Sequence, residues 1–156
     1  MPLLRAALSW NFVLATAICA SLLAQLIKVL LNLFIFHRFI AERMWGAGGM
    51  PSSHSATVCA MVVATGRYCG VNSPIFAIAA VLSIIVMYDA MGVRYETGEQ
   101  AKVLNRMFTE WMDQGFEQFQ LPHGKKLKEM VGHTPLQVVA GFLVGLVVGL
   151  LYPLGL

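Results

Sequence analysis

Two of the four histidines have neighbours that suit the binding of an anion. His54 lies in the string GAGGMPSSHSA, residues 46–56, where glycines allow close approach of the backbone and Pro51 suits the first position of a helix. The free N–H groups of the first helical turn and the hydroxyls of Ser52 and Ser53 together make an anion site. We therefore expect His54 to face a bound anion. The plainer interpretation is a capped helix start with a buried histidine.

His133 stands directly before a second predicted helix start. Thr134, Pro135 and Gln137 fit an N-cap, a first-turn proline and a capping-box partner. A histidine just outside a helix N-terminus can face a bound anion. Capping explains neither His133 nor Lys128, so we expect both side chains at an anion site.

A third string, YDAMGVR at residues 88–94, combines an acid with a base. An aspartate near the end of an apolar stretch is costly, and an ionisable group in such a place indicates function by default. Arg94 fits a bidentate clamp on phosphate oxygens, because a guanidinium matches their geometry. The alternative is an ion pair between Asp89 and Arg94 that holds the helix end.

The elements that must position these strings are apolar. Of 156 residues, 58% are hydrophobic and only 12% are charged, whereas soluble domains carry about a quarter. Only helices satisfy the backbone of long apolar runs in a membrane, and the alternation of a barrel is missing. We predict one all-α integral membrane domain over residues 1–156. Its four transmembrane helices are expected at residues 10–36, 53–69, 75–93 and 135–153.

The polar region between the third and fourth predicted spans contains one more helix. Thr97 and Gln100 fit a capping box, and apolar residues recur at helical spacing behind them. This pattern predicts an amphipathic helix over residues 97–119, either in the headgroup layer or against another subunit. Its predicted apolar face contains Leu104, Phe108, Trp111, Met112 and Phe119.

The four spans place residues 37–52 and 94–134 on one side of the membrane. That side carries eight lysines and arginines, and the other side carries Arg5 and Arg67. The positive-inside rule makes the basic side cytoplasmic, in a plasma membrane of bacterial type. The net charge of +3 is small, and the basic residues lie beside membrane segments, so we expect no nucleic-acid partner.

All three strings fall on this basic side, which favours a shared phosphate site. One histidine can attack phosphorus as a nucleophile while the other protonates the leaving oxygen. The proposed phosphate ligands are Ser52, Ser53, Arg94, Lys128 and Lys28, the last by extending along its helix. This chemistry requires no metal and no cofactor.

Four motifs along the chain, given at the end of this paragraph, resemble those of the divergent branch of the type 2 phosphatidic acid phosphatase superfamily. That superfamily is related to vanadium haloperoxidases. The resemblance covers about residues 20–150. It implies that His54 is the acid and that His133 is the nucleophile that becomes phosphohistidine. The motifs are MPSSHSA (50–56), DAMGVR (89–94), GEQA (98–101) followed by Asn105, and GHTP (132–135).

Three positions depart from the main superfamily. Gln137 stands where an aspartate would assist the nucleophile, and Leu127 stands where an arginine is usual. The arginine-proline pair of the first motif is also missing. Asp89, Gln100 and Asn105 remain candidates for structural or functional roles.

Three functions follow, in order of preference. The first is a phosphatase acting on phosphatidic acid or on a polyprenyl phosphate or diphosphate. The second is a lipid-phosphate binding or translocating protein without turnover, which Gln137 and the missing arginine favour. The third is a metal-dependent site built from Asp89, Glu99 and a histidine.

A glycine repeat in the fourth span indicates a close helix contact. Gly141, Gly145 and Gly149 recur every four residues, so they share one helical face. We expect this face to pack within the bundle or to form a homo-oligomer.

Overall fold

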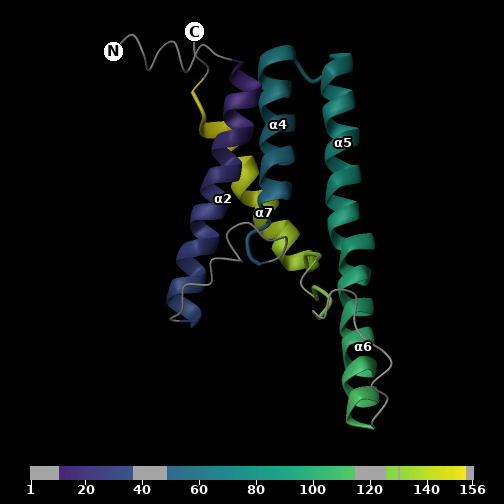
Figure 1. The fold of residues 1–156 in the computed structure, drawn as a ribbon. Helices are drawn as coiled ribbons and strands as arrows, with labels where there is room; N and C mark the ends of the chain where they lie inside the picture. Colours follow the sequence, from purple (N-terminus) through teal and green to yellow (C-terminus); the bar gives the residue numbers. More distant parts are fainter. Residues whose placement is uncertain (1–10, 37–48, 115–125, 130, 154–156) are drawn as a thin grey trace.

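A computed structural model describes residues 11–36, 49–114, 126–129 and 131–153. These residues form helices and connecting segments, with no strand among them. The helices are α2 (Phe12–Phe36), α4 (Ser53–Cys69), α5 (Pro74–Met91), α6 (Val93–Asp113) and α7 (Pro135–Leu151) (Figure 1). Each of the four predicted apolar spans corresponds to one helix, so the helical fold class is confirmed.

Among the described residues, two stretches are long and apolar enough to cross a membrane by length and composition. They are Phe12–Phe34 and the continuous stretch Pro74–Met112, whereas Pro135–Leu151 is a shorter apolar helix. Crossing by all four helices therefore stays a prediction.

Side-chain caps explain where two of the helices begin. The Ser52 hydroxyl accepts a hydrogen bond from the Ser55 N–H (3.3 Å) before α4, and the Ser73 hydroxyl accepts one from Phe76 (3.2 Å) before α5. Each cap satisfies a backbone donor that the helix itself leaves without a partner.

Helix α4 is the centre of the bundle and packs against α2, α5 and α7 (Figure 1). The buried core consists mainly of alanines, which allow helix backbones to approach closely. Large apolar side chains such as Ile78 and Leu22 are instead about two-thirds exposed, as lipid-facing residues would be. The core cluster is Ala20, Ala24, Ala56, Ala60 and Val148.

The glycine stripe of α7 faces α4. Gly141, Gly145 and Gly149 are buried. A Cβ on Gly145 would lie against the Ala56 carbonyl oxygen and 2.8 Å from Cβ of Cys59. The stripe is therefore used inside the bundle. The predicted alternative, a homo-oligomer formed through these glycines, does not fit, because α4 already covers them.

Helix α6 differs from its prediction in two respects. It begins at Val93 and not at residue 97, so Thr97 lies inside the helix and its hydroxyl donates to the Val93 carbonyl (2.8 Å). The capping box predicted for Thr97 and Gln100 is therefore wrong. The helix ends at Asp113, and the rest of the predicted helix, including Phe119, lies outside the described residues.

The course of α6 also bears on its predicted location. It continues α5 in nearly the same direction and extends beyond the bundle (Figure 1). A helix in the headgroup layer lies in the membrane plane, across the direction of the spanning helices. If α5 crosses the membrane, the predicted interfacial position does not fit α6.

Replacement of Gly145 by alanine tests the contact between α4 and α7. Gly→Ala ordinarily favours a helix by about 1 kcal/mol. Here we expect a loss of about 1–3 kcal/mol, because the new methyl group overpacks the interface. Thermal unfolding in detergent measures it, with Val139→Ala at an exposed position of α7 as the matched control. A Gly145→Ala variant as stable as the control would contradict the assigned contact.

Candidate active site

Three of the predicted site residues meet at one cavity, although they are distant in the sequence. His54 from α4, Arg94 from α6 and His133 from the segment before α7 line it. The ring centroids of the two histidines are 6.2 Å apart, with the ring planes at 61°. The cavity volume is about 20 Å³, which accommodates about one water molecule. Its remaining walls are the apolar side chains of Val86, Ala90 and Val131.

Two backbone hydrogen bonds hold the helix ends around this cavity. The Ser52 N–H donates to the Gln137 carbonyl (3.0 Å), which places the N-termini of α4 and α7 side by side. The His133 N–H donates to the Ala90 carbonyl (3.0 Å), which joins the start of α7 to the end of α5. Two helix N-termini thus contribute partial positive charge to the same place.

The hydrogen bonds of Gln137 determine the tautomer of His133. Oε1 of Gln137 lies 3.2 Å from the Thr134 backbone nitrogen and 3.2 Å from Nδ1 of His133. A backbone N–H can only donate, so this Gln137 atom is the oxygen, and Nδ1 must then carry the proton. The lone pair of His133 is therefore on Nε2. That atom is buried and has no hydrogen-bond partner among the described residues.

The surroundings of His133 favour its neutral form. The residue is only 2% exposed, and this burial lowers its pKa below the ordinary value of 6.5. The hydrogen bond to Gln137 acts in the opposite direction, and positive charge on Lys28, His54 and Arg94 lowers the pKa further. At neutral pH His133 therefore presents an uncharged imidazole with a free Nε2.

Lys28 of α2 is a buried cation, and its predicted contact with a phosphate stays a prediction. It is 1% exposed, and its charge acts on His54 and on His133. Gly49, at φ +85°, lies beside its stem, and a Cβ at this position would be 3.4 Å from Cδ of Lys28. Such a contact is an ordinary one, so it is the positive φ, which other residues avoid, that favours glycine at this position.

Both predicted serine ligands have structural partners. The Ser52 hydroxyl caps α4 and also accepts from the Ser55 hydroxyl (3.0 Å). The Ser53 hydroxyl accepts from Nε2 of Gln25 on α2 (3.4 Å). These bonds explain why serines occur here, and contact with a phosphate stays a prediction.

Asp89 and Arg94 form the expected ion pair, with Oδ2 and Nε 2.6 Å apart. Arg94 also lines the cavity, and its role as a clamp on phosphate oxygens stays a prediction. Each charge opposes its helix dipole, because Asp89 lies in the last turn of α5 and Arg94 in the first turn of α6. The ion pair brings the two opposite charges together at this junction.

The remaining candidates lie away from the cavity. Gln100 is exposed on α6, and Lys128 is exposed in the segment 126–129. Asn105 is buried and holds that segment on α6.

The metal-site hypothesis has no support in the described part of the chain. No group of three or more potential ligands occurs there. Glu99, one of the ligands it requires, forms an ion pair with Lys102 (2.6 Å).

Sequence reasoning missed the backbone at this site. The carbonyls of Ala90 and Gln137 hold the two helix starts, and backbone groups leave no signature in residue type. It also missed the packing of Gly132, a residue of the GHTP motif, against the backbone of Arg94 and Tyr95. The glycine next to His133 was the only available signal.

Comparison with known proteins agrees with the resemblance seen in the motifs. Residues 9–148 match the Divergent PAP2 family. The chain is also 36% identical over 146 residues to the uncharacterized membrane protein YuiD of Bacillus subtilis (strain 168), covering 90% of this chain and 92% of YuiD. No solved structure gives a significant match. The chain therefore belongs to the divergent PAP2 family.

Two substitutions of Gln137 test the tautomer assignment. We expect Gln137→Glu to raise the pKa of His133 above that of the wild type, because a carboxylate stabilises the imidazolium. We expect Gln137→Leu to remove the Nδ1 acceptor and with it the single tautomer. Nuclear magnetic resonance titration of labelled histidines measures both, with Gln100→Glu at an exposed position as the charge-matched control. An unchanged pKa in Gln137→Glu would show that Gln137 is not the partner of Nδ1.

Proposed function

We propose that this protein is a membrane-embedded phosphatase that hydrolyses the phosphate ester of a lipid. The observation that carries the proposal is the free Nε2 of a neutral His133, which lies at a cavity shared with His54 and Arg94. A nucleophile, an acid and a cation at one small cavity are the groups that phosphoryl transfer through a histidine needs.

The proposed reaction has two steps. Nε2 of His133 attacks phosphorus, and as the P–N bond forms the P–O bond to the lipid breaks. Protonated His54 gives its proton to the leaving oxygen. Water then loses a proton to His54 and attacks phosphorus, which breaks the P–N bond and releases phosphate. Arg94 and Lys28 stabilise the charge on the equatorial oxygens throughout.

Gln137 has a limited role in this reaction. Its oxygen holds Nδ1–H of His133 and so directs Nε2 towards phosphorus. An amide does not stabilise the positive charge of phosphohistidine as a carboxylate would. We therefore expect slower turnover than in a site with aspartate at this position.

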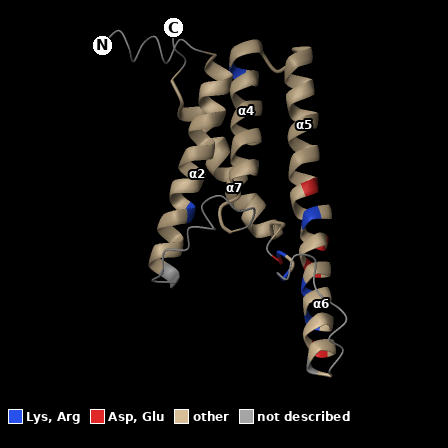
Figure 2. Ribbon diagram, in the orientation of Figure 1, with Lys and Arg blue, Asp and Glu red and all other residues tan. Residues whose placement is uncertain are grey.

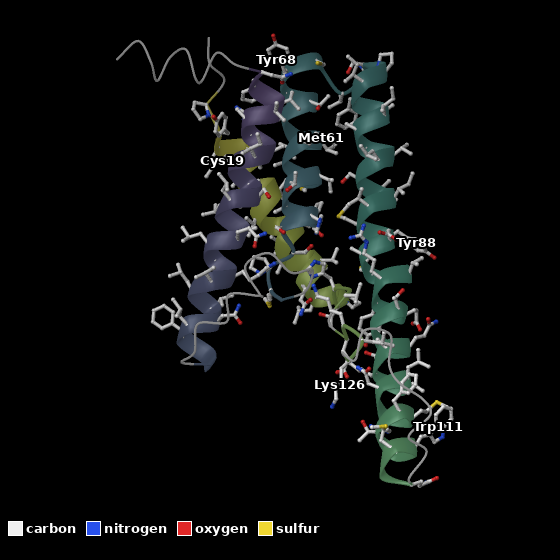
Figure 3. The ribbon with its side chains drawn as sticks, in the orientation of Figure 1. Cys19, Met61, Tyr68, Tyr88, Trp111 and Lys126 are labelled. Carbon is white, nitrogen blue, oxygen red and sulfur yellow. The ribbon has the colours of Figure 1, made fainter. Side chains whose placement is uncertain are left out.

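The position of the site along the bundle supports a lipid substrate. Helical rise separates Ser53 from Cys69 by about 24 Å, and a bilayer core is about 30 Å thick. Aromatic residues typical of a membrane interface, Tyr68 among them, lie at the end of α4 opposite the site (Figure 3). The site would then lie within several ångströms of the other boundary, near the depth of a phospholipid phosphate.

The distribution of charge supports four crossings with the site on the cytoplasmic side. Arg67 is the basic residue at the end of α4 away from the site, where its guanidinium donates to the carbonyls of Gly149 (2.6 Å) and Tyr152 (2.8 Å). Helix α6, which carries Lys102 and Arg106 beyond Arg94, extends away from the end of the bundle that bears Arg67 (Figure 2). The positive-inside rule makes that side cytoplasmic. A bacterial plasma membrane fits the similarity to the membrane protein YuiD.

A second function, binding or translocating a lipid phosphate without hydrolysis, is supported by two observations. Gln137 replaces the expected carboxylate, and the cavity of about 20 Å³ is too small for a phosphate group unless the site opens. Turnover separates the two functions.

Phosphate release from lipid phosphates tests the proposal. We would offer phosphatidic acid, polyprenyl phosphate and polyprenyl diphosphate to the purified protein in detergent, with and without a chelator. We expect chelator-resistant release that falls at least about 10³-fold in His133→Ala and about 10²–10⁴-fold in His54→Ala. Cys69→Ser, exposed at the opposite end of α4, is the control.

Each other result has a definite meaning. Undiminished release by His133→Ala would exclude this nucleophile. Saturable lipid binding without release would favour the carrier, and release abolished by the chelator would require a metal.

The pH dependence of kcat/KM provides an independent check. Protonation removes the Nε2 lone pair, so kcat/KM should fall as the pH drops through the pKa of His133, which lies below 6.5. It should fall again as the pH rises far enough for His54 to lose the proton that it donates. An acidic limb centred above 6.5 would contradict the burial of His133 as a neutral base.

A further inference from the structure

The segment before His133 is attached to α6 by a buried asparagine. Nδ2 of Asn105 donates to the Leu127 carbonyl (2.9 Å) and to Oε1 of Glu129 (2.9 Å). Oδ1 of Asn105 accepts from the Leu127 N–H (2.9 Å). The side chain therefore pairs with both backbone groups of Leu127, as a neighbouring strand would. Asn105 is only 5% exposed, so water does not replace these bonds readily.

Glycines bring the same segment into backbone contact with α6. A Cβ on Gly98 would collide with the Glu129 carbonyl oxygen. A Cβ on Gly132 would lie 2.6 Å from the carbonyl carbon of Arg94. Gly98 and Asn105 are seven residues apart, which is two helical turns, so they share one face of α6. The buried Ala101 lies between them on that face.

These contacts determine the position of His133. Gly132 precedes the histidine directly, and its contact with Arg94 sets the nucleophile beside the cation of the same cavity. Beyond it, the His133 N–H bonds to Ala90 of α5 and the ring bonds to Gln137 of α7. His133 is therefore held by α5 and α7, and α6 holds the described residues that precede it.

We propose that the face of α6 formed by Gly98, Ala101 and Asn105 is a template for residues 126–129, 131 and 132, and that Asn105 is a positioning residue for His133. It acts through the backbone and does not touch the reacting atoms. This role accounts for a motif, Gly98 to Asn105, that neither membrane insertion nor helix capping explains. Its kinetic consequence rests on the proposed phosphatase, but the placement of the imidazole does not.

The test compares Asn105→Ala with Arg106→Ala, an exposed neighbour on another face of α6. Titration of labelled histidines by nuclear magnetic resonance, with His133→Ala to assign the signal, reads the His133 environment without any substrate. In Asn105→Ala we expect the Nδ1–H tautomer to give way to a mixture and the pKa to rise towards its ordinary value, because the ring becomes hydrated. Arg106→Ala should match the wild type.

Kinetics provide the second readout. Misplacement of the nucleophile by about 1 Å should lower kcat about 100-fold in Asn105→Ala and leave KM within a few-fold, because Arg94 and Lys28 still bind phosphate. Glu129→Ala removes one of the three bonds and should give a smaller change in the same direction. If Asn105→Ala does not fold, the Glu129→Ala variant still tests the proposal.

The outcomes separate this inference from the proposed function. An unchanged His133 tautomer and pKa in Asn105→Ala would overturn the template, whatever the turnover. If Asn105→Ala fails to fold, an unchanged His133 signal in Glu129→Ala would overturn it in the same way. If the wild type releases no phosphate from any lipid while Asn105→Ala still shifts the His133 signal, the phosphatase fails and the positioning role stands.

Discussion

The close approach of α4 and α7 is the constraint on which the rest of the structure depends. Gly141 leaves no side chain between the two helices, so the backbone of Ser52 reaches the Gln137 carbonyl. That hydrogen bond sets two helix N-termini side by side, and the ring centroids of His54 and His133 are then 6.2 Å apart. A bulkier α7 would separate the helix starts, and the two histidines would no longer share a cavity.

Gln137 shows how a local capping feature becomes part of the site. Its side chain satisfies the Thr134 N–H, as a capping residue should, and the same oxygen accepts the proton of His133 Nδ1. The capping bond identifies the oxygen, and the oxygen then determines which ring nitrogen has the lone pair. The same side chain therefore caps the start of α7 and orients the ring of the proposed nucleophile.

The rod formed by α5 and α6 connects the membrane region with the segment that carries His133. Its junction at Gly92 bears Asp89 and Arg94, whose ion pair lies at the edge of the cavity. Beyond the junction, one face of α6 holds Leu127 and Glu129 through Asn105 and Gly98. Figure 3 shows Trp111 on the part of α6 beyond this contact, where the helix extends past the bundle.

The helices, most of their ends and three of the residues that line the cavity, His54, Arg94 and His133, could be predicted from the sequence alone. Apolar length, Ser52, Thr134 and the position of each histidine are local features, and local features can be identified from spacing. The sequence did not determine that the glycine stripe faces α4, that α6 starts at Val93, or that Asn105 holds Leu127. Those depend on which helix faces meet across 20 residues or more of chain, and only the packed bundle decides that.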